Sequence, residues 1–176
     1  MGELISAVED AFRAYEVGDA QMPAKSYIDL PQYNGDFRSM PAFLDAESWD
    51  AAAIKWVNVH PDNPESFGMP TVMGTVIYSD PANAYPLSIM DGTVLTKKRT
   101  GAAAGVATDH LAVEDASSMG IIGVGSQAYT QLEAVANVRD IDTVVVNDVD
   151  ESKIEAFADH YEDRFEVRSG SIAEAA

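Results

Sequence analysis

Hydrophobic positions recur with two different periods in the first two thirds of the chain. Residues 3–16 carry apolar side chains at helical spacing, which predicts an amphipathic helix, and an alanine-rich run from Thr96 to about residue 111 predicts a second helix. Between these helices apolar and polar positions alternate, which is typical of half-buried strands. The strands expected are residues 25–31, 37–43, 54–60, 71–79 and 85–90, with a loop at residues 61–68. Turn residues at 34–36 and 80–83 join neighbouring strands, so we expect a mostly antiparallel sheet.

From residue 114 onward, short apolar runs alternate with helical segments. Strands are predicted at residues 119–123, 143–148 and 165–168, with helices at 127–138 and 151–161 between them. This order predicts a parallel sheet and makes up one mononucleotide-binding half of a doubly wound fold. Residues 172–176 read as the opening of another helix, so we expect the second half to lie outside this chain. The expected fold class is α/β: a mixed α+β domain at residues 1–113, then an incomplete Rossmann domain at residues 114–176, with a doubly wound parallel sheet.

A glycine turn between the first strand and the first helix of this second part predicts dinucleotide binding. Gly123, Gly125 and Ala128 form the pattern Gly-x-Gly-x-x-Ala. The first glycine allows a tight turn, the second lets a pyrophosphate approach the backbone, and the small third residue lets helix and strand pack closely. Asp148 ends the next strand, 25 positions after Gly123, where a carboxylate suits both hydroxyls of an adenine ribose. The alternative is an ordinary strand-turn-helix that binds no nucleotide.

Composition narrows the classes of partner. The chain has 11 Lys and Arg against 29 Asp and Glu, a formal charge of −18, and it is 47% apolar. This balance predicts a folded core under a strongly acidic surface, and it disfavours nucleic acid and anionic membranes as partners. Such a surface favours a halophilic protein from a high-salt cytoplasm, where salt screens the self-repulsion; an acidic protein from a low-salt organism is the alternative.

Other absences in the sequence exclude further classes. The chain has no cysteine, which excludes disulfides and thiolate metal sites. It shows no signal-peptide pattern and no apolar run near the roughly 20 residues of a membrane span, so we expect a soluble, cytoplasmic protein. His60 has no second His or Cys near it in the sequence, and no metal site is expected.

Lys and Arg residues are scarce in this chain, so those on predicted strands are candidates for binding or catalysis. Lys25, Arg38 and Lys55 each fall on a predicted strand of the same sheet and could converge at one end or face. A convergent set suits a small carboxylate, because Arg binds it with a planar fork and a buried Lys can act as a base. The alternative is a set of exposed strand charges that relieve acidic repulsion.

A further anion site is expected at Arg99 and Thr100, which introduce the alanine-rich helix. The guanidinium together with backbone N–H groups of the helix start would bind the phosphates of a cofactor. The alternative is that this stretch only marks the start of the helix, with Thr96 or Thr100 as the N-cap.

Several of these segments together resemble the ornithine cyclodeaminase and mu-crystallin family. The matching segments are Glu9-Asp-Ala-Phe-Arg-Ala-Tyr15, Gln21-Met-Pro-Ala-Lys25, Arg38-Ser-Met-Pro-Ala-Phe43, Lys55-Trp-Val-Asn-Val-His-Pro61, Pro70-Thr-Val-Met-Gly74, Met90-Asp-Gly-Thr93, Arg99-Thr-Gly-Ala-Ala103 and Gly123-Val-Gly-Ser-Gln-Ala128. Within the family they look closest to the archaeal alanine dehydrogenases. The resemblance runs from about Gly2 to the last residue and covers what looks like the first half of a family member.

The resemblance implies a role for each candidate. It assigns Lys55 to proton transfer at the amine or carbonyl carbon, and Lys25 and Arg38 to the substrate. It assigns Arg99, Ser126, Gln127 and Asp148 to the cofactor, where they join Thr100, Gly123 and Gly125, the candidates already expected from the residues themselves. Asp148 is the ribose-binding acid that favours NAD. Residues 1–113 would then form a substrate-binding and dimerisation domain, and residues 114–176 the first half of an NAD-binding Rossmann domain.

The implied reaction is NAD-dependent oxidative deamination of L-alanine to pyruvate and ammonia by a homodimer that pairs through the first sheet. Residues that hold the nicotinamide would lie beyond Ala176, so the chain alone is expected to be inactive or nearly so. Two alternatives stay open. One is an ornithine cyclodeaminase, which recycles its NAD, and the other is a non-catalytic dinucleotide-binding protein like mu-crystallin.

Overall fold

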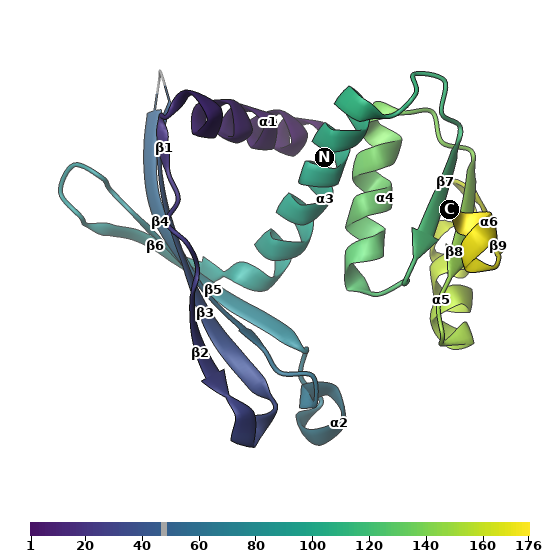
Figure 1. Ribbon diagram of the computed structural model, residues 1–176, viewed down its shortest axis with the longest axis horizontal. Coiled ribbons are helices and arrows are strands. Elements are labelled where there is room, and N and C mark those ends of the chain that lie inside the picture. The colour runs from purple at the N-terminus through teal and green to yellow at the C-terminus, as the bar shows by residue number, and fades with distance from the viewer. Residues whose placement is uncertain (47–48) are drawn as a thin grey trace. The chain divides into compact units, whose positions relative to one another are not determined.

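The computed structural model describes residues 1–46 and 49–176, which form two sheets and six helices (Figure 1). The helices are α1 (Gly2–Val17), α2 (Asn63–Phe67), α3 (Gly92–Leu111), α4 (Ser126–Val138), α5 (Glu151–Tyr161) and α6 (Ile172–Ala175), and a short 3₁₀ helix spans Pro31–Tyr33. The strands are β1 (Ala20–Gln21), β2 (Ser26–Leu30), β3 (Gly35–Ala46), β4 (Trp49–Val59), β5 (Val72–Ser79), β6 (Pro86–Asp91), β7 (Ser118–Ile122), β8 (Thr143–Asn147) and β9 (Glu166–Ser169). The α/β fold class expected from the sequence is confirmed.

The described chain divides into two compact units. One contains Asp10–Thr96, and the other contains Met1–Glu9 together with Lys97–Ala176. Helices α1 and α3 each begin in one unit and end in the other. The predicted division into domains at residues 1–113 and 114–176 stays a prediction.

The unit Asp10–Thr96 is built on the antiparallel sheet. Its strand order is β1-β3-β4-β5-β6. Strands β1 and β2 both pair with β3: β1 lies opposite Phe43 and Leu44, and β2 lies opposite residues 35–39. Residues that lie directly opposite each other in an antiparallel pair share a face, and so do residues two apart along a strand. Away from the irregularity at Tyr78 and Ser79, the register therefore assigns the described side chains of this sheet to one of two faces.

Two local predictions in this unit were wrong. The expected loop at residues 61–68 contains helix α2, which has Pro64 in its first turn and ends at Gly68 in the left-handed region, φ +62°. Helix α3 begins at Gly92, not at Thr96. Asp91 Oδ1 accepts the backbone N–H of Thr93 at 2.7 Å, which caps the additional turn.

The second unit is built on the parallel sheet, in the order β7-β8-β9. Its core contains Leu132 of α4 and Phe157 and Tyr161 of α5, packed against Val144 and Val146 of β8, and all five are at most 1% exposed. The three strands and the helices between them agree with the predicted single mononucleotide half, and α6 agrees with the predicted opening of a further helix.

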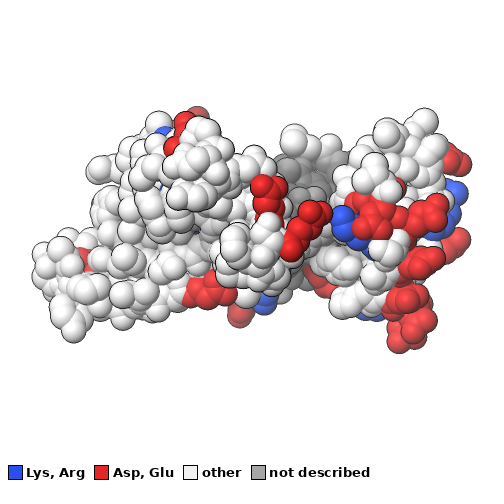
Figure 2. All heavy atoms as spheres, turned by 90° about the horizontal axis from the view of Figure 1, so that it is seen from below, with Lys and Arg blue, Asp and Glu red and all other residues white. Residues whose placement is uncertain are grey.

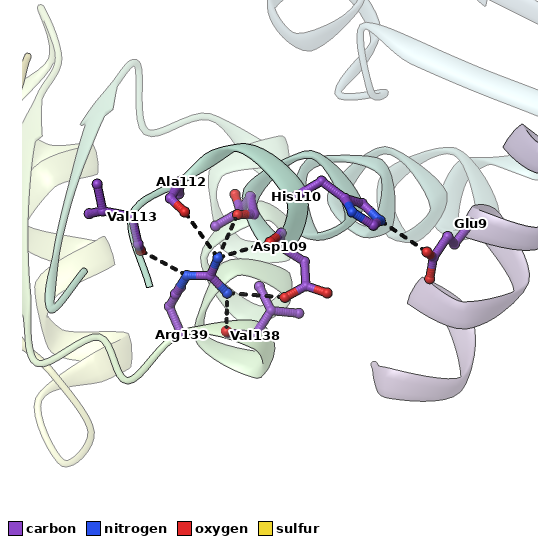
Figure 3. A network of polar contacts seen from close by, with 8 residues as sticks. Glu9, Asp109, His110, Ala112, Val113, Val138 and Arg139 are labelled. Carbon is purple, nitrogen blue, oxygen red and sulfur yellow. Dashed lines mark hydrogen bonds and ion pairs between the residues drawn. The ribbon is translucent and has the colours of Figure 1, made fainter. Parts of the chain in front are cut away.

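Arg139 joins the end of α4 to the end of α3 (Figure 3). Its side chain is 8% exposed. The guanidinium donates to the carbonyl oxygens of Thr108, Asp109, Ala112, Val113 and Val138 and to the Asp109 carboxylate, at 2.7 to 3.2 Å. The last four carbonyls of a helix have no partner within it, and this one side chain binds two of those of α3, Thr108 and Asp109, together with the two carbonyls that follow the helix.

The surface is acidic, as the sequence predicts. On the face drawn in Figure 2, Asp and Glu side chains far outnumber Lys and Arg, in keeping with the formal charge of −18. No helix within residues 1–46 and 49–176 combines the length and the apolar character that crossing a bilayer requires.

Candidate functional site

The turn between β7 and α4 has the geometry of a phosphate cradle. Gly123 has φ +90°, which favours glycine, and its N–H donates to the Asn147 carbonyl at 2.7 Å. Gly125 is the N-cap of α4, and a Cβ added there would meet nothing within 4 Å. Within the described residues this helix has no side-chain cap at Gly125, so the N–H groups of its first turn, at its positive end, are suited to an anion.

Asp148 closes this turn from the end of β8. Its Oδ1 accepts the N–H of Asp150 at 3.0 Å, and its Oδ2 accepts the N–H of Val124 at 2.8 Å. These two bonds hold the pKa of Asp148 below its ordinary value. The side chain is therefore a carboxylate at neutral pH, and each oxygen keeps lone-pair capacity for a ribose hydroxyl.

Gln127 places at this turn a buried acceptor that has no hydrogen-bond partner within residues 1–46 and 49–176. Its Oε1 is buried and accepts no hydrogen bond from the part of the chain that the structure describes. Buried polar atoms almost always have a partner, so this oxygen fits a donor that the protein itself does not supply. Together with the open space at Gly125, it indicates that these residues fit a bound dinucleotide. Ser126 is exposed beside it.

Arg99 and Thr100 lie in the same unit as this turn, although not at a helix start. Because α3 begins at Gly92, their backbone N–H groups lie inside the helix, and the expectation that these groups form an anion site is wrong. The exposed guanidinium of Arg99 keeps its capacity to bind an anion. The same stretch of α3 packs on α4, where Thr130 Oγ1 lies 3.0 Å from the carbonyl oxygens of both Lys97 and Gln127.

The register of the antiparallel sheet brings Arg38 and Lys55 onto one face. Arg38 lies opposite Val57, while Lys55 lies opposite Met40, two positions along β3 from Arg38. Lys25 directly precedes Ser26, the first residue of β2, which pairs with Ser39 between Arg38 and Met40. Lys25 is exposed, whereas Arg38 and Lys55 are half-buried. The three cations are thus neighbours in the register at one place on this sheet.

Arg38 is oriented by a partner that the sequence analysis missed. Its Nε and Nη2 donate to the two oxygens of Asp36 at 2.7 Å each, and its guanidinium carbon lies 5.3 Å from the Tyr27 ring centroid. This bidentate bond raises the pKa of Arg38 and lowers the pKa of Asp36. One edge of the guanidinium is used, and the other edge keeps N–H donors for a substrate carboxylate. The spacing of two along one strand is the signal that would have identified Asp36.

Lys55 has a partner from helix α3. Its Nζ lies 3.2 Å from Thr96 Oγ1, within the same compact unit. From the sequence Thr96 is expected only as a helix cap, and the contact with Lys55 is visible only in the folded chain.

His60 lies apart from this cluster. It follows β4, and its ring packs against Phe37 while its Nδ1 lies 3.1 Å from Asn58 Nδ2. Phe37 and Asn58 oppose each other on the face that does not carry Arg38. Within the described residues, no group of three or more His, Cys, Asp or Glu is arranged to hold a metal ion.

The match to known proteins extends over the whole chain. Residues 1–176 match the ornithine cyclodeaminase/mu-crystallin family. The chain belongs to this family. It is 47% identical over 164 residues to an alanine dehydrogenase of Archaeoglobus fulgidus, which covers 93% of the chain and 49% of that protein. It is also 31% identical over 164 residues to an L-lysine cyclodeaminase of Streptomyces rapamycinicus, covering 90% of the chain and 46% of that protein.

Solved structures of the family share the fold. An archaeal alanine dehydrogenase dimer with bound NAD aligns with a TM-score of 0.91 at 44% identity, over 99% of this chain and 52% of that one. A Thermococcus litoralis Δ1-pyrroline-2-carboxylate reductase in complex with NADH and L-proline aligns with a TM-score of 0.93 at 38% identity, over 99% and 54%. The chain spans about half the length of the relatives that it matches.

Proposed function

We propose that this chain contributes the substrate cations and the adenosine-binding half of an NAD-dependent oxidoreductase that acts at the α-carbon of a small amino acid. L-alanine is the substrate we favour, since an alanine dehydrogenase is among its most similar relatives. The observation that carries the proposal is that one chain holds two built elements: a glycine turn closed by Asp148, and a sheet face that carries Arg38 beside Lys55.

For the cofactor, we assign Gly123, Gly125, Ser126 and Gln127 to the pyrophosphate and Asp148 to the adenine ribose. Arg99 and Thr100 would complete the phosphate site from α3. NAD supplies the hydride acceptor of the reaction. A carboxylate at the ribose favours NAD over NADP, because a 2′-phosphate would meet a like charge.

For the substrate, Arg38 binds the carboxylate through the guanidinium edge that faces away from Asp36, and Lys25 adds a second positive charge. Lys55 takes up and returns the protons of the amine and of the attacking water. The overall reaction balances as L-alanine, NAD⁺ and water giving pyruvate, ammonium, NADH and one proton. Positioning of the α-carbon for hydride transfer requires near-attack distances of roughly 3–3.5 Å.

The face of the sheet opposite Arg38 and Lys55 is where we propose that a second copy binds. Trp56, Ile77 and Ile89 lie on that face and are 40%, 36% and 70% exposed. A cavity of about 320 Å³ on the same sheet is lined largely by apolar residues, including Phe43 and Ile54. Apolar surface of this kind favours a partner, and a relative of known structure is a dimer. We therefore propose a homodimer that leaves the substrate face of each sheet free.

The proposed function is tested with two proteins, this chain and a longer one. The chain itself is titrated with ADP-ribose, NAD and NADP by calorimetry, and we expect binding of the first two and weaker binding of NADP. A protein extended to the length of its relatives is then assayed for NADH formation with L-alanine, L-ornithine and other amino acids. Absence of nucleotide binding in the first experiment would refute the cofactor assignment.

The main alternative within the family is a cyclodeaminase, which the likeness to an L-lysine cyclodeaminase supports. That reaction returns its NAD to the starting state, so it consumes a diamino acid with no net NADH. Net NADH from alanine favours the dehydrogenase, and ammonia release from ornithine without NADH favours the cyclodeaminase. A non-catalytic protein would bind the nucleotide and turn over neither substrate.

A further inference from the structure

The first turn of α3 lies directly on the antiparallel sheet. A Cβ added at Gly92 would lie 2.9 Å from the carbonyl carbon of Gly74 and 3.1 Å from its oxygen, so only a glycine fits there. Asp91 caps the same turn through the N–H of Thr93. The start of α3 is therefore anchored on β5 at Gly74.

This anchor determines where Thr96 lies. Thr96 comes four residues after Gly92, and positions four apart share a face of a helix. In the sheet beneath, Gly74 lies opposite Val57, and Lys55 lies two positions away from Val57 on the same strand and face. The contact between Thr96 Oγ1 and Lys55 Nζ, at 3.2 Å, follows from the way that the helix is seated on the sheet.

A hydroxyl suits a lysine whose protonation changes during a reaction. Threonine has one donor and two acceptor lone pairs, so it accepts from the ammonium form of lysine and donates to the neutral amine. An ionised carboxylate in the same place would only accept, and it would favour the charged form. The residues of the first turn of α3, Gly92 to Thr96, include no ionisable side chain.

Other ionisable groups share the face of Lys55. On the neighbouring strands these side chains are Tyr27, Asp29, Asp36, Arg38 and Tyr78, with Lys25 directly before β2. Asp36 is bound by both of its oxygens to Arg38. Thr96 comes from a different element and reaches Nζ itself.

We propose that Thr96 is a positioning residue, which holds the Lys55 amine in place through both of its protonation states. This role rests on the proposed function of Lys55 as the proton carrier. The close contact between Gly92 and Gly74 supports this role, because a shift of α3 away from the sheet would move the Thr96 hydroxyl away from Nζ of Lys55.

The test measures how fast each lysine of the chain is acylated by a small amine-reactive ester, quantified per residue by mass spectrometry. Nζ must leave the Thr96 hydroxyl in order to react. In Thr96→Val we therefore expect Lys55 to react roughly fivefold faster, the factor that corresponds to a hydrogen bond of about 1 kcal/mol. In Thr96→Ser, which keeps the hydroxyl, we expect a Lys55 rate close to that of the unaltered chain. Lys97, Lys98 and Lys153 serve as internal references.

The matched control is Thr75→Val on β5, which makes the same substitution on the opposite face of the sheet. A Lys55 rate that is equal in the unaltered chain, Thr96→Ser and Thr96→Val would overturn the proposal. An equal increase at every lysine would also overturn it, because it would show that the hydroxyl serves folding alone. Thr96→Ala, which removes the hydroxyl and a methyl group, should give the same selective increase at Lys55 as Thr96→Val. A selective effect on Lys55 in a protein that never oxidises alanine would support the positioning role and count only against the proposed substrate.

Discussion

Arg139 is the side chain whose loss we expect to destabilise the parallel-sheet unit most. Its guanidinium is nearly buried and makes six hydrogen bonds, five of them to carbonyl oxygens at the ends of α3 and α4 (Figure 3). A hydrogen bond to a charged group contributes about 1.5–3 kcal/mol, although such terms are not additive and water reaches part of the freed helix end. We expect Arg139→Met to lower the free energy of unfolding by about 3 kcal/mol, roughly the value of one or two of these bonds.

The assay is urea unfolding followed by far-UV circular dichroism. With a slope of about 2 kcal/mol per molar urea, the midpoint of this unit should fall by about 1.5 M. Both tryptophans of the sequence fall within the other unit, Asp10–Thr96, so tryptophan fluorescence should shift much less. Arg164→Met is the matched control: its ion pair with Glu133 is 52% and 34% exposed, and such surface pairs contribute about 0–1 kcal/mol. Equal midpoint shifts for the two variants would refute the claim that Arg139 binds the helix end.

Three further changes test the remaining assignments. Asp148→Asn should weaken ADP-ribose binding by about tenfold in calorimetry, because it removes a charged acceptor, whereas Asp159→Asn on the exposed face of α5 should not. Acid should destabilise the chain: hydrogen bonds lower the pKa values of Asp148 and Asp36 in the folded state, so their stabilising effect is complete above the ordinary value of 3.8 and is lost as the pH falls through the folded-state values. Asp36→Asn should therefore flatten the dependence of the urea midpoint on pH below about 4, and an unchanged slope there would contradict the role of Arg38 as its partner. Ile89→Lys should convert dimers to monomers in light scattering, while Val149→Lys, which changes a fully exposed residue of the other unit, should have no effect.

Alternating polarity predicted most strands of the antiparallel sheet, and short apolar runs predicted those of the parallel sheet. The shared face of Arg38 and Lys55 depends in addition on the register between β3 and β4, which the folded chain supplies. Local cues for two helix features were present but were not used. Pro64 and Gly68 bracket α2, and Asp91 caps α3, yet Gly92 has low helix propensity and concealed the first turn. Neither error moved a candidate residue to a different strand. The error at α3 did remove the expected N-terminal anion site at Arg99.

What the sequence could not predict are contacts between segments far apart in the chain. Arg139 is 30 residues from Asp109, and Thr96 is 41 residues from Lys55, so no local period relates them. Both contacts depend on how a helix is seated: α3 on β5 at its start, and on α4 along its later turns. Side chains of this kind become identifiable only when the fold has set the distance between two elements.

We assign substrate binding to one face of the antiparallel sheet and dimer formation to the other. The alternation of side chains along each strand makes this separation possible. Along β4, Lys55 and Val57 point to the face that carries Arg38, while Trp56 points to the other. A shift of the register by one residue would exchange these faces and expose Arg38 and Lys55 to the apolar surface that we assign to a second copy. The burial of charged side chains in an apolar interface would oppose pairing, so the proposed dimer and the proposed substrate site favour the same register. On this reasoning, insertion or deletion of one residue within β3 or β4 should abolish both dimer formation and substrate binding. A substitution on one face should affect only the dimer or only substrate binding.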